Sequence, residues 1–241
     1  MASAGGPFRR VVLFPTGSHE YHGTELPSET DTVIADAVAR DLEGRLPERT
    51  GLETLRSPIL PYGFSPEHAG FPNTAWTSHD AYYRFVRELL FSIAADGDLI
   101  AIVNWHGGNV RSLAALENDF NYEHARCKAL ATVLDPPPVQ RLCEELLGEF
   151  DQHAGSVEAS LIAFHLGLPA RTYDTPQMVD LDGALRFFRN IELSPHGVVK
   201  RKPTIEADPD KGRRVHEAIV DSVAESIAGT LGELTPFMPS D

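Results

Sequence analysis

The sequence has little cysteine, few aromatic residues, no long apolar run and fewer basic than acidic side chains. Only Cys127 and Cys143 occur in 241 residues, which gives no sign of a disulfide scaffold or a cysteine metal site. One disulfide is possible, but two buried thiols in a reducing compartment are favoured. No stretch approaches the roughly 18 apolar residues of a membrane span, and residues 1–10 lack the apolar core of a signal peptide. We therefore expect a cytoplasmic protein with no membrane partner.

The charge balance is acidic. Lys and Arg number 21 against 35 Asp and Glu, a formal net charge of -14. A protein that binds a phosphate backbone needs a basic face, so a nucleic-acid partner is not expected. Hydrophobic residues make up 42% of the chain and charged residues 23%, as in ordinary globular proteins. With no linker or repeat, residues 1–241 are predicted to form a single domain.

Apolar strands alternate with amphipathic helices along the chain. Strands are predicted at 11–14, 55–60, 99–103 and 128–134, and helices at 32–46, 79–97, 110–125, 139–150, 157–166 and 211–234. Residues 169–203 show only a weak pattern, typical of loops with some irregular strand. The alternation predicts an α/β fold, a three-layer α/β/α sandwich with a largely parallel central sheet.

Metal-ligand side chains follow two of these strands. Glu20, His22 and Asp31 come after strand 11–14, and His106 comes directly after strand 99–103. Open α/β folds place their chemistry at the carboxyl edge of the sheet, so the four residues are expected to meet there. Glu158, at the start of a later helix, is a fifth candidate. One carboxylate can bridge two metals about 3.5–4 Å apart, and five such residues suit a two-metal site.

Each candidate also has a simpler interpretation. Asp31 alone is more often a helix N-cap, and Glu158 alone is more often a favourable charge in a first helical turn. A metal-free scaffold of caps and turns therefore stays open. The combination of three ligand types within twelve residues with His106 after a second strand favours the metal site.

Residues around His106 and before Glu158 are candidates for substrate contact and proton transfer. Gly107 and Gly108 form either a plain turn or a place where backbone N–H groups approach a substrate oxygen, and the following Asn109 is grouped with them. Trp105 either walls the pocket or packs in the core. His153 is either a turn residue or a proton shuttle. A surface position is favoured for His19, Glu25, His68 and His79.

With these residues identified, the chain resembles the creatininase (creatinine amidohydrolase) family. The motifs that carry the resemblance are Pro15-Thr16-Gly17-Ser18 with Glu20 and His22-Gly23, Leu26-Pro27, Thr30-Asp31-Thr32, Phe71-Pro72 with Thr74, Asn104 with His106-Gly107-Gly108-Asn109, and His153-Ala154-Gly155 with Glu158. Further motifs are His196-Gly197-Val198, Pro203-Thr204 and Lys211-Gly212-Arg213. Together they extend over nearly the whole chain in the family's order.

The resemblance implies a compact α/β/α fold, two divalent metal ions and a homo-oligomer, commonly a hexamer. Glu20 and His106 would hold one metal, His22 the second, and Asp31 would bridge them. Glu158 would complete the second metal's ligands, and His153 would be the acid/base. Zinc is favoured as the metal, with manganese or iron as alternatives.

The expected function is hydrolysis of a non-standard C–N amide bond in a small-molecule substrate (a cyclic amide, a formamide or a small peptide-like group) by a metal-activated water. Creatinine itself is not favoured, because Gly108 stands where creatininase has a carboxylate. Two alternatives remain: a peptidase that acts in redox-cofactor maturation, and a catalytically silent metal- or ligand-binding protein on the same fold.

Overall fold

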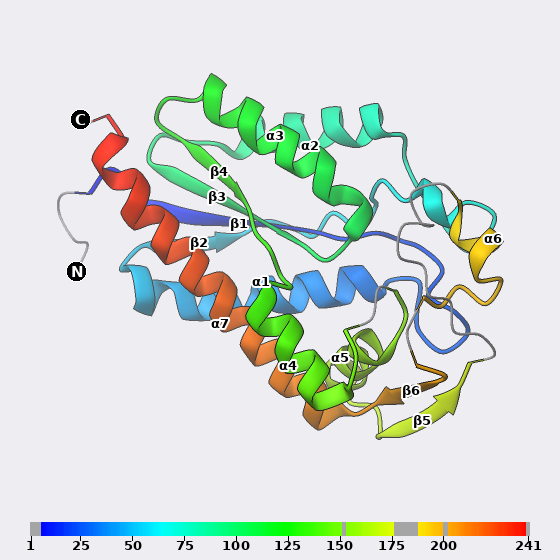
Figure 1. Cartoon of the computed structure of the whole chain (residues 1–241). Helices are drawn as coiled ribbons and strands as arrows, with labels where there is room; N and C mark the ends of the chain where they lie inside the picture. Colours follow the sequence, from blue (N-terminus) through cyan, green and yellow to red (C-terminus); the bar gives the residue numbers. More distant parts are fainter. Residues whose placement is uncertain (1–5, 151–152, 176–187, 200–201, 240–241) are drawn as a thin grey trace.

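A central sheet of four parallel strands organises the structure, a computed structural model that describes residues 6–150, 153–175, 188–199 and 202–239 (Figure 1). The strand order is β2–β1–β3–β4. Their bounds are β1 Arg10–Thr16, β2 Glu53–Arg56, β3 Asp98–Asn104 and β4 Lys128–Ala131. A separate antiparallel pair joins β5 Arg171–Asp174 to β6 Thr204–Ala207.

Helices cover both faces of the sheet. In Figure 1, α2 and α3 lie on one face and α1 and α7 on the other, which makes three layers and confirms the predicted fold class. The helices are α1 Thr30–Thr50, α2 His79–Ile93, α3 Val110–Glu123, α4 Pro137–Leu147, α5 Ser156–Leu166, α6 Asn190–Leu193 and α7 Pro209–Leu234. Short 3-10 helices are η1 Pro66–His68, η2 Gly107–Asn109 and η4 Thr235–Phe237.

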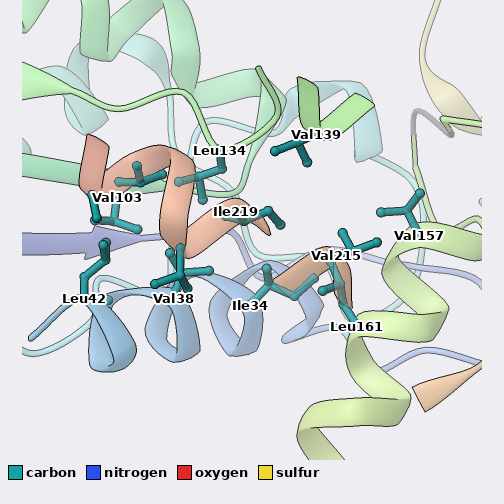
Figure 2. Close-up of a cluster of buried hydrophobic side chains, with 14 of the residues drawn as sticks. Ile34, Val38, Leu42, Val103, Leu134, Val139, Val157, Leu161, Val215 and Ile219 are labelled. Carbon is teal, nitrogen blue, oxygen red and sulfur yellow. The ribbon is translucent and has the colours of Figure 1, made fainter. Parts of the chain in front are cut away.

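The sheet separates two apolar clusters. Because side chains alternate along a strand, Val11 and Leu13 of β1 join one cluster while Val12 and Phe14 join the other. This two-sided burial is why the predicted strands read as continuous apolar runs. Figure 2 shows part of the first cluster, where side chains of α1 such as Ile34 face those of α5 and α7.

Element boundaries differ from the predictions at a few points. Helix α1 starts at Thr30 with Glu29 at the N-cap, so Asp31 is not the cap. The strand predicted at 55–60 lies at Glu53–Arg56, and Leu60 contributes only an isolated bridge to Thr16. The strand predicted at 128–134 already ends at Ala131, five residues before the first of three prolines.

Two further expectations concern thiols and membrane spans. Cys127 and Cys143 are both buried and neither forms a disulfide, as predicted. Within the described ranges, no helix has the length and apolar character needed to cross a membrane. Of the segment predicted to be loop-rich, residues 176–187 and 200–201 lie outside the described part, and the remainder includes β5 and α6.

Candidate metal centre

The centre lies at the carboxyl ends of β1 and β3, which are neighbours in the sheet. Their register pairs Thr16 with Asn104, so the two following segments leave the sheet at the same level. Gly17 contacts the first turn of α1 closely: a Cβ there would lie 2.7 Å from the Thr32 nitrogen. The glycine therefore lets the start of α1 approach the end of β1, which brings Asp31 beside the residues that follow the strand.

Asp31 faces two different imidazoles with its two carboxylate oxygens. Oδ1 lies 3.2 Å from His22 Nε2, and Oδ2 lies 3.1 Å from His106 Nδ1. The side chain is buried, and because Glu29 holds the N-cap position, helix capping does not explain it. A carboxylate divided between two sites in this way can bridge two metal ions.

The first group of possible ligands consists of Glu20, Asp31 and His106, all buried. His106 Nε2 lies 3.0 Å from the Phe64 carbonyl oxygen and donates its proton to it. Nδ1 then faces Glu20 Oε2, at 3.2 Å, and Asp31 Oδ2, at 3.1 Å. Among the described residues, neither of these oxygens has a hydrogen-bond partner. When Nδ1 gives up its proton, three electron-pair donors converge on one point, an arrangement that fits a divalent cation.

The second group consists of His22, Asp31 and Glu158. His22 Nδ1 donates to the Glu20 backbone carbonyl at 2.9 Å, so Nε2 faces the carboxylates, with Glu158 Oε2 at 3.8 Å. Two donors hold Glu158: Trp105 Nε1 at 3.0 Å from Oε1, and the Ala154 N–H at 2.6 Å from Oε2. Such outer contacts are how metal sites orient their ligands.

The charges inside the centre shift one another's pKa values. Burial alone would raise the pKa of Glu20, but the nearby histidines, His106 foremost, together hold this pKa well below its usual range. Burial alone would lower the pKa of His106, but Glu20 and Asp31 raise it well above its usual value. Burial would also lower the pKa of His22, but the charge of Asp31 and of the other nearby carboxylates raises it to about 10. The carboxylates thus require nearby positive charge, which protons or metal ions can supply.

His153 lies beside both groups. Its Nε2 donates to the Tyr21 carbonyl oxygen at 2.9 Å, and Nδ1 lies 3.6 Å from Glu20 Oε1. The ring centroid is 4.2 Å from that of His22. Burial and the charge of His22 lower the pKa of His153, so a neutral ring with a free Nδ1 is favoured. A neutral imidazole of this kind can accept a proton.

A cavity of about 350 Å³ opens onto the centre. Its lining combines the candidate ligands with an apolar wall. The lining residues are Glu20, Asp31, Asn104, Trp105, His106, Gly107, Val110, Leu134, Asp135, Phe150, His153, Val157 and Glu158. A cavity that joins convergent polar groups to an apolar wall is typical of a small-molecule or side-chain binding site.

The structure divides the predicted substrate-contact residues. Trp105 and Gly107 line the cavity. Asn109 does not: it is fully buried, and its amide bonds the Gly17 carbonyl, the Asn104 side chain and the Phe64 N–H. The substrate-binding role predicted for Asn109 is therefore wrong, because its amide instead ties together the loops behind the centre.

Gly108 is also a packing position and not one of the cavity-lining residues. A Cβ on it would overlap the Phe64 carbonyl oxygen and lie 2.5 Å from His106 Nε2. The same Cβ would lie 2.7 Å from Glu67 Oε1. The substrate-binding role predicted for Gly108 is corrected accordingly: the glycine leaves room for His106 to meet its backbone acceptor.

His68 and Glu67 are site residues that the sequence interpretation missed. His68 is 3% exposed, and its Nε2 lies 3.1 Å from Glu20 Oε1, so the predicted surface position is wrong. Glu67 Oε1 lies 3.6 Å from His106 Nε2. Both belong to η1, which lies in the loop-rich segment between β2 and α2, where no periodicity indicates which side chains face inward. Glu25 and His79 are exposed, as predicted.

Comparison with known families gives a match over most of the chain. The family model described as "Creatininase: Creatinine amidohydrolase" matches residues 6–227. The mycofactocin precursor peptide peptidase of Mycobacterium ulcerans is 31% identical over 226 residues, 90% of this chain and 84% of that protein. The protein of the same name from Mycolicibacterium smegmatis is 39% identical over 113 residues, 47% of this chain and 46% of that protein.

Solved structures of creatininases share the fold. A variant creatininase with a tryptophan replaced by phenylalanine has a TM-score of 0.68 at 20% identity, over 92% of this chain and 91% of that chain. The structure titled "Creatininase Mn" has a TM-score of 0.66 at 22% identity, over 92% and 91%. A creatininase variant of "Zn-Zn type" has a TM-score of 0.63 at 20% identity, over 92% and 90%.

Proposed function

Because the chain belongs to the creatininase family, we propose that it is a metal-dependent hydrolase of an amide-type C–N bond, with a peptide as its substrate. The position of Asp31 carries the metal-dependent part of this proposal. Its two oxygens face the imidazoles of His22 and His106, which belong to two separate ligand groups. An isolated ligand group would need no such shared carboxylate.

Two divalent ions fit the residues present. Glu20 and His106 would hold one ion, His22 and Glu158 the other, and Asp31 both. Bound there, the ions would supply Lewis acidity and a nucleophile at neutral pH. Imidazole and carboxylate ligands suit zinc, which we propose as the metal, ahead of manganese or iron.

His153 is proposed as the acid/base. Its Nε2–H donates a hydrogen bond to the Tyr21 carbonyl oxygen. Nδ1 therefore carries no proton and faces Glu20 and the cavity. In hydrolysis Nδ1 takes a proton from the attacking water and delivers it to the leaving nitrogen. The burial that keeps this ring neutral keeps it ready to accept that proton.

The relatives support a peptide substrate over a small cyclic amide. The match to the Mycobacterium ulcerans mycofactocin precursor peptide peptidase covers 90% of this chain. The apolar wall formed by Val110, Leu134 and Phe150 offers a place for side chains beside the scissile bond. We propose that the chain trims a precursor peptide during maturation of a peptide-derived redox cofactor.

Turnover by the zinc-loaded protein tests the proposal. The substrates are a mycofactocin precursor peptide, creatinine and an N-formyl amine, with products identified by mass spectrometry. Cleavage of the peptide alone, lost on chelation and restored by zinc, is the expected result. Turnover of creatinine or of the formyl compound alone would contradict the peptide substrate and identify a small amide as the substrate.

Two other results would contradict the enzyme itself. Full zinc content without turnover of any substrate would identify a silent metal-binding protein. A purified chain that takes up no metal would leave the scaffold of caps and turns as the explanation. The matched control is His153→Gln, which should keep its metal and lose turnover by about 100-fold or more.

A further inference from the structure

His68 is a buried imidazole that neither proposed ligand group uses. It is 3% exposed, at the end of η1, and its ring centroid lies 4.3 Å from that of His153. The described residues form the two groups above and a third possible one, Glu20, His22 and His153, and none of the three includes His68. An imidazole this deeply buried, next to a carboxylate, calls for a role other than packing.

The surroundings of His68 fix the place of its proton. Nε2 lies 3.1 Å from Glu20 Oε1. Without a proton on Nε2, two lone pairs would face each other at that distance, so Nε2 donates to Oε1. The side-chain nitrogen Nδ2 of Asn190, itself 3% exposed, lies 3.1 Å from Nε2 and 3.5 Å from Nδ1, and it donates to Nδ1, the ring nitrogen that carries no proton. Asn190 therefore holds the plane of the ring.

The consequence falls on Glu20, whose two oxygens have different surroundings. Oε1 accepts the His68 proton, while Oε2 faces His106 Nδ1 at 3.2 Å in the first ligand group. A carboxylate free to rotate would exchange these positions. The hydrogen bond from His68 holds Oε1, so that Oε2 stays directed at the first ligand group.

We propose that His68, held by Asn190, is a positioning residue that fixes Glu20 as a ligand of the first group. The proposal rests on the metal-dependent function proposed above. It assigns a role to η1 and α6, which are in contact. His68 of η1 and Asn190 of α6 are separated by 122 residues in the sequence. His68 acts on the metal through Glu20 and does not bind it.

Two amide substitutions separate this role from packing. In His68→Gln the side-chain nitrogen reaches the place of Nε2, so a donor to Glu20 remains. In His68→Asn the shorter side chain reaches only the place of Nδ1, and the donor is lost. Both side chains are polar and uncharged, so the two variants should have the same zinc affinity if His68 serves only in packing.

Zinc affinity is the measurement, made by competition with a chromophoric chelator on the full chain. Wild type is expected to bind two zinc ions per chain. His68→Asn should weaken one of the two about 10–100-fold, the usual cost of losing an outer contact, while His68→Gln stays within a few-fold of wild type. Asn190→Leu should lie between the two. His79→Asn, at an exposed histidine, is the matched control and should change neither affinity.

Equal zinc affinity in His68→Gln and His68→Asn would overturn the proposal, whether both bind tightly or both weakly. Thermal unfolding of each zinc-free variant shows whether it is folded, and an unfolded His68→Gln would also overturn it, since packing would then explain the residue. A wild-type chain that binds no zinc would overturn the metal-dependent function, and the role of His68 with it.

Discussion

Two groups of histidines in this protein differ in their surroundings. His22 and His106, at the end of the sheet, converge on the carboxylates of the centre, and His106 lines the cavity. His165 and His216, between α5 and α7, stack edge to face with centroids 4.7 Å apart. The second pair meets one carboxylate, Asp41, 2.9 Å from His216 Nε2 and 45% exposed.

The comparison shows that buried imidazoles alone do not indicate a metal centre. At the sheet end, three or more ligand-type side chains face one another, and the carboxylates among them need positive charge from protons or metal ions. Between α5 and α7, the single carboxylate Asp41 is matched by one histidine, and the described residues there form no ligand group. The excess of acceptors, and not the histidine count, identifies the candidate site.

The largest expected effect contrasts the carboxylates of the two groups. Asp31→Ala removes the residue shared by both ligand groups, so zinc content should fall from two ions to less than one per chain and turnover by well over about 100-fold. Asp41→Ala should leave both unchanged. Elemental analysis and peptide turnover measure the effect. An Asp31→Ala protein that still binds two zinc ions would contradict the bridging role of Asp31 and the difference expected between Asp31 and Asp41.

A smaller effect is expected at two adjacent glycines. In Gly108→Ala the new methyl group collides with the Phe64 carbonyl and with His106, whereas at Gly107 no atom lies within 4 Å of the added Cβ. Overpacking of this kind costs about 1–3 kcal/mol, and here it also displaces a ligand. Gly108→Ala should unfold at a lower temperature and bind zinc more weakly, and Gly107→Ala should match wild-type stability. Equal behaviour of the two variants would contradict the close packing around His106.

The smallest effect concerns pH and the second histidine pair. Burial and the neighbouring His216 lower the pKa of His165 to about 4, while the unfolded chain titrates near its usual 6.5. Between these values the unfolded state binds more protons, so stability falls as pH decreases through that window. His165→Gln removes this contribution.

Thermal unfolding of the zinc-free protein at pH 7 and pH 5 measures the difference. The fall in Tm between these pH values should be smaller in His165→Gln than in wild type by about 1–3 °C. The carboxylates contribute equally to both proteins, so the difference isolates His165. An identical fall in the two would show that this ring is protonated as easily in the folded as in the unfolded chain.

The sequence alone predicts the parts of the centre that are tied to regular elements. The strands β1 and β3 are continuous apolar runs, and their parallel pairing brings Glu20, His22 and His106 to one edge without further information. The position of Asp31 follows from the start of the next helix. The predicted meeting of these four residues agrees with the structure, while their binding of metal stays a prediction.

Contacts made by loops could not be predicted. His68 and Asn190 meet across 122 residues, from a 3-10 turn and a four-residue helix, where neither a 3.6-residue nor a two-residue period marks an inward face. Asn109 was misassigned for a related reason: its place in a glycine turn indicates proximity to the site, but not that its amide bonds Gly17 and Phe64 behind it. Side-chain direction in such turns depends on the tertiary contacts themselves.

The pairing of Thr16 with Asn104 also makes the centre a test of correct folding. A shift of β3 by one residue along β1 would turn His106 to the opposite side of the sheet and separate it from Glu20 and Asp31. Tight metal binding would then belong only to chains with the native strand register. Bound zinc would in turn stabilise that register by mass action, so loss of metal would be the earliest sign that the middle of the sheet has opened.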